Sequence, residues 1–424
     1  MLIKFIYFIF QICFIISIIK IPFELEKTEE KEYDFERDTF YNNYSSIIEL
    51  GNPIQKIKTK ISMEEFSFYI LKDKLYNPSK SNTYKIINEE ENDIKNEDYS
   101  SGIFSSELFI LKDLKDKKIK IENLNFMLAT KKIFDKELQS MLIGFKNMDY
   151  FKEKKRNLIF QLKNLSIINS YTFTIKYNKN NNDKGEIIIG NNPDEYDKDY
   201  LSSNFRYGKV ETDNYQRYWQ FTFDKIISEN ITIDSDVLMR FSFDFGVIVS
   251  NNYYNNYIKS KFFTDNIKNK TCDFKFLSNH NFYFYSCNEN VDLKNFPKLT
   301  LYNKILNYTF EFDYNDLFIK VNDRYYFLVV FQLQQGFQKW ILGKPFMKKY
   351  QMVFDQDKDI IGFYTFIYKK SSFGFFHILS LIFLIIIIIL CVLYFKLSFN
   401  KKRRIKACEL DENIYYVPYD TSIK

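Results

Sequence analysis

Residues 50–70 read Leu-Gly-Asn-Pro-Ile-Gln-Lys-Ile-Lys-Thr-Lys-Ile-Ser-Met-Glu-Glu-Phe-Ser-Phe-Tyr-Ile. We interpret this stretch as a β-hairpin, and its middle carries the residues that decide its chemistry, Ser62-Met63-Glu64-Glu65. The question that the rest of the sequence must answer is which fold would place a serine and two carboxylates at that point.

The segment between residues 38 and 366 reads as short strands separated by polar loops. Stretches such as 186–189 and 219–224 are β-branched or aromatic, and both residue types favour strands. Polar clusters at 178–184, 191–199 and 251–256 read as loops. Two helical patterns stand out, Phe134–Leu142 and Leu158–Leu165. The pattern therefore predicts an all-β class.

The N-terminus has the composition of a secretory signal peptide. One lysine, Lys4, precedes an apolar run from Phe5 to Ile19. No clear small-residue cleavage site follows, so an uncleaved anchor is the alternative. We expect a signal peptide at 1–20 and a short N-terminal arm at 21–37.

A second apolar run, Ile378–Phe395, has Ser380 as its only polar residue. About 20 apolar residues cross a bilayer as a helix, and this run lacks the polar face of a globular core helix. The basic cluster at 401–406 follows and marks the cytosolic side. We expect a transmembrane helix at 373–396, a cytosolic tail at 397–424 and a single-pass type I topology.

The charge distribution and the histidine count exclude several functions. The formal net charge is +6, of which Lys4 and Lys20 supply +2. The tail from Lys396, with seven basic and four acidic residues, supplies +3, which leaves about +1 for the ectodomain. That balance does not predict a nucleic-acid face. His280 and His377 are the only histidines, which argues against a Ser-His hydrolase or a His-rich metal site. We expect no metal and no cofactor.

Cysteines and glycosylation motifs agree with an extracellular or lumenal ectodomain. Cys272 and Cys287 are its only cysteines, and two cysteines that close a short loop in an oxidising compartment predict a disulfide. Asn-X-Ser/Thr motifs mark candidate glycosylation sites. They lie at Asn43, Asn164, Asn230, Asn269 and Asn307.

The order of these segments resembles the pepsin-like (A1) aspartic peptidases over about residues 38–366. Residues 44–70 are similar to the opening active-site hairpin of that family. Tyr99-Ser100-Ser101-Gly102 resembles the tip of the flap, with Tyr99 as the flap tyrosine. Leu142-Ile143-Gly144 is similar to the hydrophobic-hydrophobic-glycine element of the first ψ-loop.

The second half repeats the plan. Residues 218–226 resemble the family's Tyr-Trp-Gln strand, and Phe241–Gly246 sits where the second Asp-Thr-Gly belongs. Residues 340–346, which include Gly343, resemble the C-terminal ψ-loop. The resemblance implies a bilobal, all-β, pepsin-like aspartic peptidase fold with lobes at 38–205 and 206–366, followed by the transmembrane helix.

The family's reaction needs two carboxylates that share one proton and hold a water between them. By resemblance, Ser62 stands where the first catalytic aspartate belongs. Asp244 would be the surviving dyad member, with Gly246 at the spacing that the tight turn requires. A serine without a base can hold a water but cannot deprotonate it.

Other replacements affect the same loops. Glu64 stands where the family has a glycine, which supplies backbone freedom. Met63 and Phe245 replace hydroxyl residues that brace the dyad across the lobes. Glu64 and Glu65 follow Ser62 in a tight loop, so we expect their side chains to point away from the missing carboxylate's position. The pattern indicates a retained scaffold with a dismantled reaction centre.

The leading hypothesis is a catalytically impaired pseudoprotease that binds extended peptide or protein segments in its interlobe cleft. The first alternative is an active, atypical aspartic endopeptidase that pairs Asp244 with an unexpected carboxylate. The second is a surface adhesion or interaction module with contacts on the loops at 178–184 and 251–256. We expect a membrane-anchored monomer in the secretory or endosomal pathway or at the cell surface, with a lumenal or extracellular ectodomain.

Overall fold

The structure is a computed structural model that divides into two compact units, Met1–Ile367 and Tyr368–Lys424. It describes residues 17–26, 33–41, 44–65, 68–71, 76–91, 99–132, 141–147, 156–178, 181, 183–212, 218–277, 281–332, 340–365 and 382–399.

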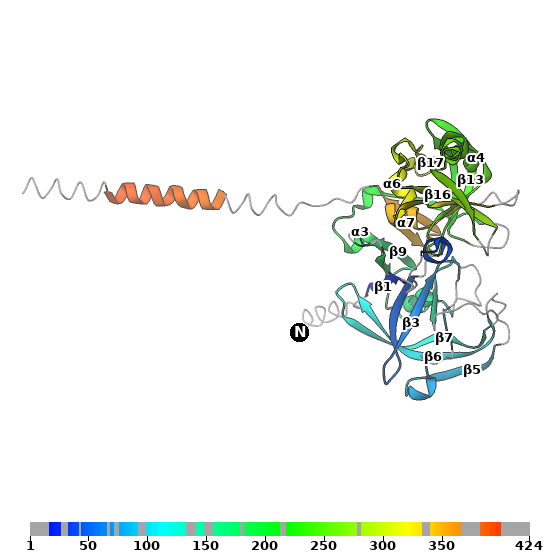
Figure 1. The fold of residues 1–424 in the computed structure, drawn as a ribbon. Helices are drawn as coiled ribbons and strands as arrows, with labels where there is room; N and C mark the ends of the chain where they lie inside the picture. The colour runs from blue at the N-terminus through cyan, green and yellow to red at the C-terminus, as the bar shows by residue number, and fades with distance from the viewer. Residues whose placement is uncertain are drawn as a thin grey trace, which may run out of the picture. The chain divides into compact units, whose positions relative to one another are not determined.

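The first unit contains a 13-stranded sheet in the order β11-β24-β23-β9-β10-β1-β2-β3-β8-β4-β7-β6-β5. Figure 1 shows β3, β5, β6 and β7 together in one body of this unit. The strands are β1 Ile19–Leu25, β2 Tyr44–Leu50, β3 Gln55–Ser62, β4 Phe68–Leu71, β5 Lys85–Glu91, β6 Tyr99–Asp113, β7 Lys118–Lys132, β8 Met141–Gly144, β9 Thr172–Tyr177, β10 Lys184–Ile189, β11 Phe205–Lys209, β23 Met352–Asp355 and β24 Ile360–Tyr364.

A second, 11-stranded sheet follows the order β18-β17-β12-β13-β22-β14-β21-β16-β20-β19, with β15 paired to β16. Its members β13, β16 and β17 lie in the other body of the same unit (Figure 1). The strands are β12 Gln220–Ser228, β13 Ile231–Phe241, β14 Ile248–Ser250, β15 Cys272–Phe276, β16 Phe282–Asn288, β17 Leu299–Asn303, β18 Tyr308–Phe312, β19 Phe318–Val321, β20 Arg324–Phe327, β21 Val329–Gln332 and β22 Trp340–Leu342.

The helices of this unit are short and connect the strands. The α-helices are α2 Leu158–Asn164, α3 Pro193–Tyr196, α4 Asn252–Ile258, α5 Thr264–Lys268, α6 Tyr314–Leu317 and α7 Lys344–Lys349. Single helical turns of other types occur at Glu36–Phe40, Pro78–Lys80, Ser202–Asn204, Lys259–Phe263 and Leu293–Asn295. The all-β prediction is confirmed.

Strand β1 begins before the expected end of the signal peptide. Its alternating sequence buries Ile19, Ile21 and Phe23 while Pro22 and Glu24 remain exposed. β1 pairs with β10 from Ile19 to Glu24, so it is an integral strand of the first sheet. The expected boundary at residue 20 would divide this strand, and the first part of the expected arm at 21–37 is therefore a core element. Residues 1–16 lie outside the described residues.

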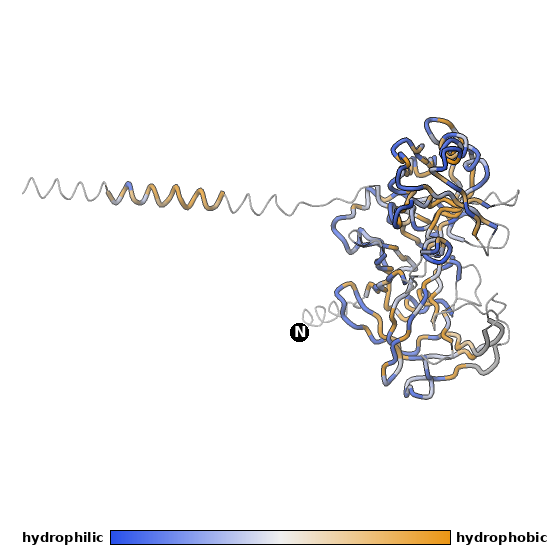
Figure 2. Tube along the Cα trace, viewed as in Figure 1, coloured by the Kyte–Doolittle hydropathy of each residue, from blue (hydrophilic) through white to orange (hydrophobic). Residues whose placement is uncertain are grey.

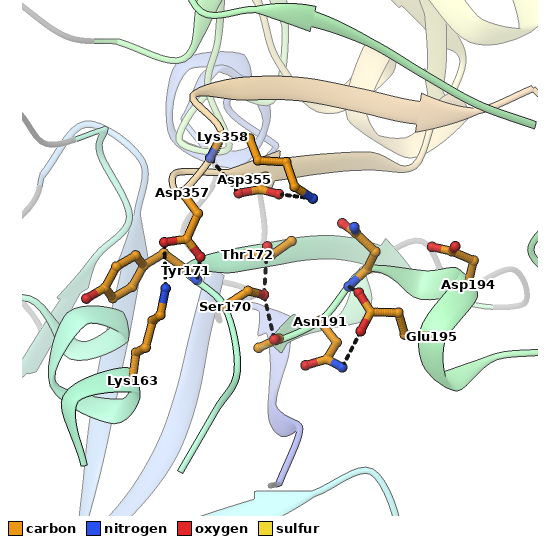
Figure 3. A network of polar contacts seen from close by, with 12 residues as sticks. Lys163, Ser170, Tyr171, Thr172, Asn191, Asp194, Glu195, Asp355, Asp357 and Lys358 are labelled. Carbon is orange, nitrogen blue, oxygen red and sulfur yellow. Dashed lines mark hydrogen bonds and ion pairs between the residues drawn. The ribbon is translucent and has the colours of Figure 1, made fainter. Parts of the chain in front are cut away.

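The end of the first unit returns to the first sheet. β23 pairs with β9, and β24 pairs with β11, so strands from the expected second lobe complete a sheet of the first. Polar contacts secure this junction (Figure 3). Lys163 of α2 forms an ion pair with Asp357 at 2.6 Å, and the backbone N–H of Tyr171 donates to the other Asp357 oxygen at 3.0 Å.

Four local predictions, two helices and two loops, are tested by the described elements. The helix predicted at 158–165 is confirmed by α2, which Asn157 caps by accepting a hydrogen bond from the Phe160 N–H at 3.1 Å. The helix predicted at 134–142 is wrong at its end, because Met141–Gly144 is strand β8, and 134–140 lie outside the described residues.

The loop predicted at 251–256 is helical instead. Asn251 caps α4 by accepting a hydrogen bond from the Tyr254 N–H at 3.2 Å. Tyr254 and Ile258 lie four residues apart on the buried face of that helix. Of the asparagines that suggested a loop, Asn251 is the cap and Asn256 is exposed, whereas Asn255 is buried and accepts a hydrogen bond from Tyr285 at 3.0 Å. Similarly, Pro193–Tyr196 within the loop predicted at 191–199 forms α3.

The second unit contains one described helix, Ile382–Phe399. Its 18 residues have a mean hydropathy of 2.8, and by length and composition it can cross a membrane. Figure 2 colours it as apolar along most of its length. The predicted start at residue 373 is among residues 366–381, which, with residues 400–424, lie outside the described residues.

Candidate functional site

Two parallel strand pairs define equivalent positions in the two halves of the first unit. In the first half, β3 runs parallel to β8 and places Ser62 opposite Gly144. In the second half, β13 runs parallel to β22 and places Phe241 opposite Leu342. The next residues in register are Ser242 and Gly343. Ser62 and Ser242 are therefore the matching residues of the two loops.

This register corrects the expected role of Asp244. It lies two residues after Ser242, as Glu64 lies two residues after Ser62, so Asp244 is the counterpart of Glu64 rather than of a catalytic aspartate. The Asp-X-Gly spacing of Asp244 and Gly246 suggested the other alignment. Strand pairing decides the question, because it fixes which residue faces the ψ-loop glycine. The residues in register with the two ψ-loop glycines are thus both serines.

The two serines are buried and engaged. Ser62 is 2% exposed, and its Oγ accepts hydrogen bonds from the backbone N–H groups of Glu64 at 3.1 Å and Glu65 at 3.3 Å. Ser242 is fully buried, and its Oγ donates to Oε1 of Glu64 at 2.6 Å. Among the described residues, neither hydroxyl contacts an imidazole or a lysine, the bases that usually activate a serine nucleophile.

The two carboxylates each reach across to the opposite loop. Oε1 of Glu64 accepts from Ser242, and Oδ2 of Asp244 accepts from the backbone N–H of Met63 at 2.8 Å. The two bonds cross between the halves in opposite directions. The prediction that the Glu64 side chain points away from this centre is therefore wrong. The tight turn sends it toward the other half, where Ser242 and Arg240 bind it.

Arg240 supplies the positive charge of the cluster. Its Nη2 forms an ion pair with Oε2 of Glu64, and its guanidinium lies over the ring of Tyr218 at 3.6 Å from the ring centre. Burial lowers the pKa of Arg240 to about 10, and the negative charge of Asp244 opposes that shift. Arg240 therefore stays protonated at neutral pH, close to two carboxylates.

This arrangement differs chemically from a proton-sharing dyad. A dyad raises one pKa because two like charges lie together without a neutralising cation. Here Arg240 neutralises Glu64 directly and acts electrostatically on Asp244. A cation that is paired with Glu64 and close to Asp244 therefore stands where a dyad would have two carboxylates without a neutralising charge.

The backbone around the second loop explains why residue 343 is glycine and shows what Gly246 binds. A Cβ on Gly343 would lie 2.1 Å from the carbonyl oxygen of Val247, so only glycine fits there. The N–H of Gly246 donates to the carbonyl oxygen of Phe40 at 2.9 Å. Tyr41 also forms a β-bridge with Phe245, so the segment before β2 is bound to the loop that carries Asp244.

The predicted flap residues lie on the hairpin of β5 and β6. Tyr99 is the first residue of β6 and pairs with Lys132 of β7, and Gly102 pairs with Glu91 and Ala129. A Cβ on Gly102 would lie 2.4 Å from the Met127 sulfur. Residues 92–98 between the two strands lie outside the described residues, and the role of Tyr99 stays a prediction.

The disulfide is confirmed between Cys272 and Cys287, which face each other on β15 and β16. Asn43 lies outside the described residues. The other four glycosylation candidates are exposed at element ends or turns, where glycans are sterically accessible, and their occupancy stays a prediction. They are Asn164, Asn230, Asn269 and Asn307.

Metal binding has no structural support in the part of the chain that is described, where no group of three His, Cys, Asp or Glu side chains could hold an ion. A cavity of about 1470 Å³ lies away from the serine-bearing loops and is lined mainly by β1, β2, β3 and β10. Its lysines include Lys58, Lys118 and Lys184, which are already paired with Glu26, Glu49 and Glu24.

Comparisons with known proteins agree with this geometry. The pepsin-like class of fold has two lobes, each with a large sheet and a matching ψ-loop, and this chain has that arrangement. The family model for eukaryotic aspartyl proteases matches residues 55–366, which is more than half of the chain, and the protein belongs to this family.

Solved structures show the same fold at low sequence identity. Basic 7S globulin from soybean superposes with a TM-score of 0.62 at 12% identity, covering 84% of this chain and 97% of that one. Conglutin gamma, a basic 7S globulin from lupine seeds, gives 0.61 at 12% identity and covers 82% and 95%. No curated protein matches the sequence.

Proposed function

We propose that this protein is a membrane-anchored pseudoprotease that binds an extended peptide or protein segment between its lobes without cutting it. The observation that carries the proposal is the pair of hydrogen bonds by which each loop's carboxylate binds the opposite loop. Glu64 binds Ser242, and Asp244 binds the Met63 N–H, where a protease would hold two aspartates around a water.

Binding would use the parts of the fold that the altered centre leaves intact. Extended ligands bind such proteins by main-chain hydrogen bonds to a neighbouring hairpin. The β5–β6 hairpin that carries Tyr99 and Gly102 would supply that edge over the ligand. The helix Ile382–Phe399 would anchor the chain as a type I protein. We place it in the secretory or endosomal pathway or at the cell surface.

An atypical endopeptidase is the second candidate, and one observation favours it. Glu64 and Asp244 are carboxylates at equivalent positions, and both cross to the opposite loop. The ion pair between Arg240 and Glu64 argues against it, because a proton-sharing dyad has two neighbouring carboxylates with no cation between them. The adhesion alternative rests on exposed residues of α4, such as Tyr253.

The deciding experiment incubates the purified full-length chain in detergent with a diverse peptide library between pH 3 and 7. We expect mass spectrometry to find no cleavage and to recover a subset of peptides uncut on the protein. Cleavage that disappears in both Asp244→Asn and Glu64→Gln would establish the endopeptidase instead. Cleavage that persists in both variants would be assigned to a contaminant.

The location of binding is tested by two matched variants. Deletion of residues 92–98 should abolish peptide retention, because it removes the end of the β5–β6 hairpin. Tyr253→Ala with Asn256→Ala on the exposed face of α4 should leave retention unchanged. The reverse result would favour the adhesion module and overturn binding between the lobes.

A further inference from the structure

Strand β15 has one open edge. Among the described strands it pairs only with β16. The carbonyl of Thr271 accepts from Asn288, and the N–H of Leu277 donates to Phe282, which shows that odd-numbered residues face β16. Because hydrogen-bonding direction alternates along an antiparallel strand, the backbone groups of Cys272, Phe274 and Phe276 point away from β16.

The same segment exposes two aromatic side chains. Phe274 is 51% exposed and Phe276 is 58% exposed, and their ring centres lie 5.7 Å apart on one face. The disulfide between Cys272 and Cys287 holds the start of the strand in place. An ordered open edge beside exposed aromatic rings is a template for another strand.

We propose that β15 pairs antiparallel with β15 of a second copy of this chain, with a two-fold axis at Phe274. Even-numbered residues must meet even-numbered residues for the outward backbone groups to bond. Three registers near the strand centre satisfy this condition. The central one places Asp273 of each copy opposite the second copy's Lys275.

Charge selects that central register. A shift of the second copy by two residues in one direction places Asp273 against Asp273, and in the other direction it places Lys275 against Lys275. Like charges directly opposite one another destabilise a strand pair, whereas opposite charges stabilise it. The strand sequence Asp-Phe-Lys is therefore self-complementary under two-fold symmetry, as an isologous contact requires.

The structure also holds the Asp273 carboxylate, the acidic side of this pair, in a defined position. Asp273 accepts a hydrogen bond from Nη2 of Arg324 at 2.8 Å and another from Ser286, which hold its carboxylate in place. An ionised carboxylate can accept about four hydrogen bonds, so capacity remains for a lysine. The inference departs from the monomer expected from the sequence and is independent of the proposed function.

Exposed lysines on sheet edges can also prevent strands of two chains from pairing. The experiment distinguishes a lysine that promotes dimerisation from one that prevents it. Sedimentation of the full-length chain in detergent, with Asn269→Gln to remove a nearby glycosylation motif, should show a concentration-dependent dimer. Lys275→Asp should weaken dimerisation by about tenfold, because it places two like-charged pairs across the axis. Lys275→Arg should leave it unchanged.

A cross-link tests the register. In a chain with Cys13, Cys391 and Cys408 changed to serine, Phe274→Cys should form a disulfide-linked dimer, because hydrogen-bonded partners lie about 5.5 Å apart at Cα. Tyr253→Cys, equally exposed on α4, should remain uncross-linked. If Lys275 instead prevents edge pairing, the chain should be a monomer at all concentrations and should form no cross-link at residue 274. That result, or a dimer insensitive to Lys275→Asp, would overturn the proposal.

Discussion

At the scale of single residues, the centre of this protein is defined by which groups replace the aspartates and what those groups then bind. Ser62 and Ser242 fill both matching positions, and the carboxylates have moved two residues along each loop. The consequence is a neutralised cluster around Arg240 in place of a reactive pair. Two predictions belong to this scale.

Ser62→Asp alone should not create peptidase activity. The variant still lacks the second aspartate, because Ser242 remains, and Glu64 still occupies the position at which the family has glycine. Loss of one central catalytic group costs about 10⁴-fold or more in rate, so no turnover above background is expected. The assay is peptide cleavage at pH 3–5 with and without pepstatin. Pepstatin-sensitive turnover by this single variant would contradict the equivalence of Ser62 and Ser242.

Arg240→Met should destabilise the fold, and Glu64→Gln in the same chain should restore much of the loss. Removing Arg240 leaves Glu64 with no cation, whereas the double variant leaves no charge at either position. The side chains are 18% and 25% exposed, so we expect about 2 kcal/mol for the single change, less than for a fully buried pair. Urea unfolding of the four proteins in the cycle measures the coupling.

At the scale of elements, sequence patterns predicted strands better than they predicted where each strand meets its partner. The hairpin at 50–70, α2 and the ψ-loop glycines follow from local sequence. The role of Asp244 did not, because Asp244-Phe-Gly246 mimics the expected spacing and only pairing between β13 and β22 reveals that Ser242 faces Gly343. β1 was missed because its alternating residues lie inside an apolar run that also fits a signal peptide.

Gly343→Ala should disrupt the second loop. The added Cβ would lie 2.1 Å from the Val247 carbonyl oxygen and 2.4 Å from that of Phe245, and backbone atoms at those distances cannot be relieved by a rotamer change. We expect a loss above about 3 kcal/mol of unfolding free energy, measured by thermal or chemical unfolding. Gly208→Ala is the matched control, since its nearest atoms lie at 3.9 Å and should tolerate the methyl group.

At the scale of the whole first unit, aromatic residues dominate the interior and set its response to alkali. Burial raises the pKa of Tyr41 and of Tyr200 to about 12, and raises that of Tyr254 further. An unfolded tyrosine ionises near pH 10. The stabilisation from each buried phenol is therefore complete below about pH 10 and lost as pH rises through the folded-state value.

The expected outcome is cooperative alkaline unfolding between about pH 10 and 12. Arg240 acts in the opposite sense. Its pKa in the folded protein is lowered to about 10, so its loss of a proton favours the folded state as the pH rises. It is one group, however, against many tyrosines. Circular dichroism and phenolate absorbance should change together over this interval. Exposed tyrosines such as Tyr207 and Tyr253 contribute absorbance without unfolding. Absorbance that reaches the amplitude of all the tyrosines near pH 10 while the circular dichroism stays native would contradict the burial of Tyr41, Tyr200 and Tyr254.

The pairing of β23 with β9 has a consequence for biosynthesis. Phe354 meets Phe173, so a ribosome must translate almost the entire first unit before the first sheet can close. Until then β9 has an unpaired edge, and β11 lacks β24, its only partner among the described strands. Contacts between such distant residues form slowly, and open edges attract other chains. We therefore expect the nascent protein to need chaperones until its last strands emerge, and a premature stop codon before residue 360 to yield an aggregation-prone fragment rather than a soluble half.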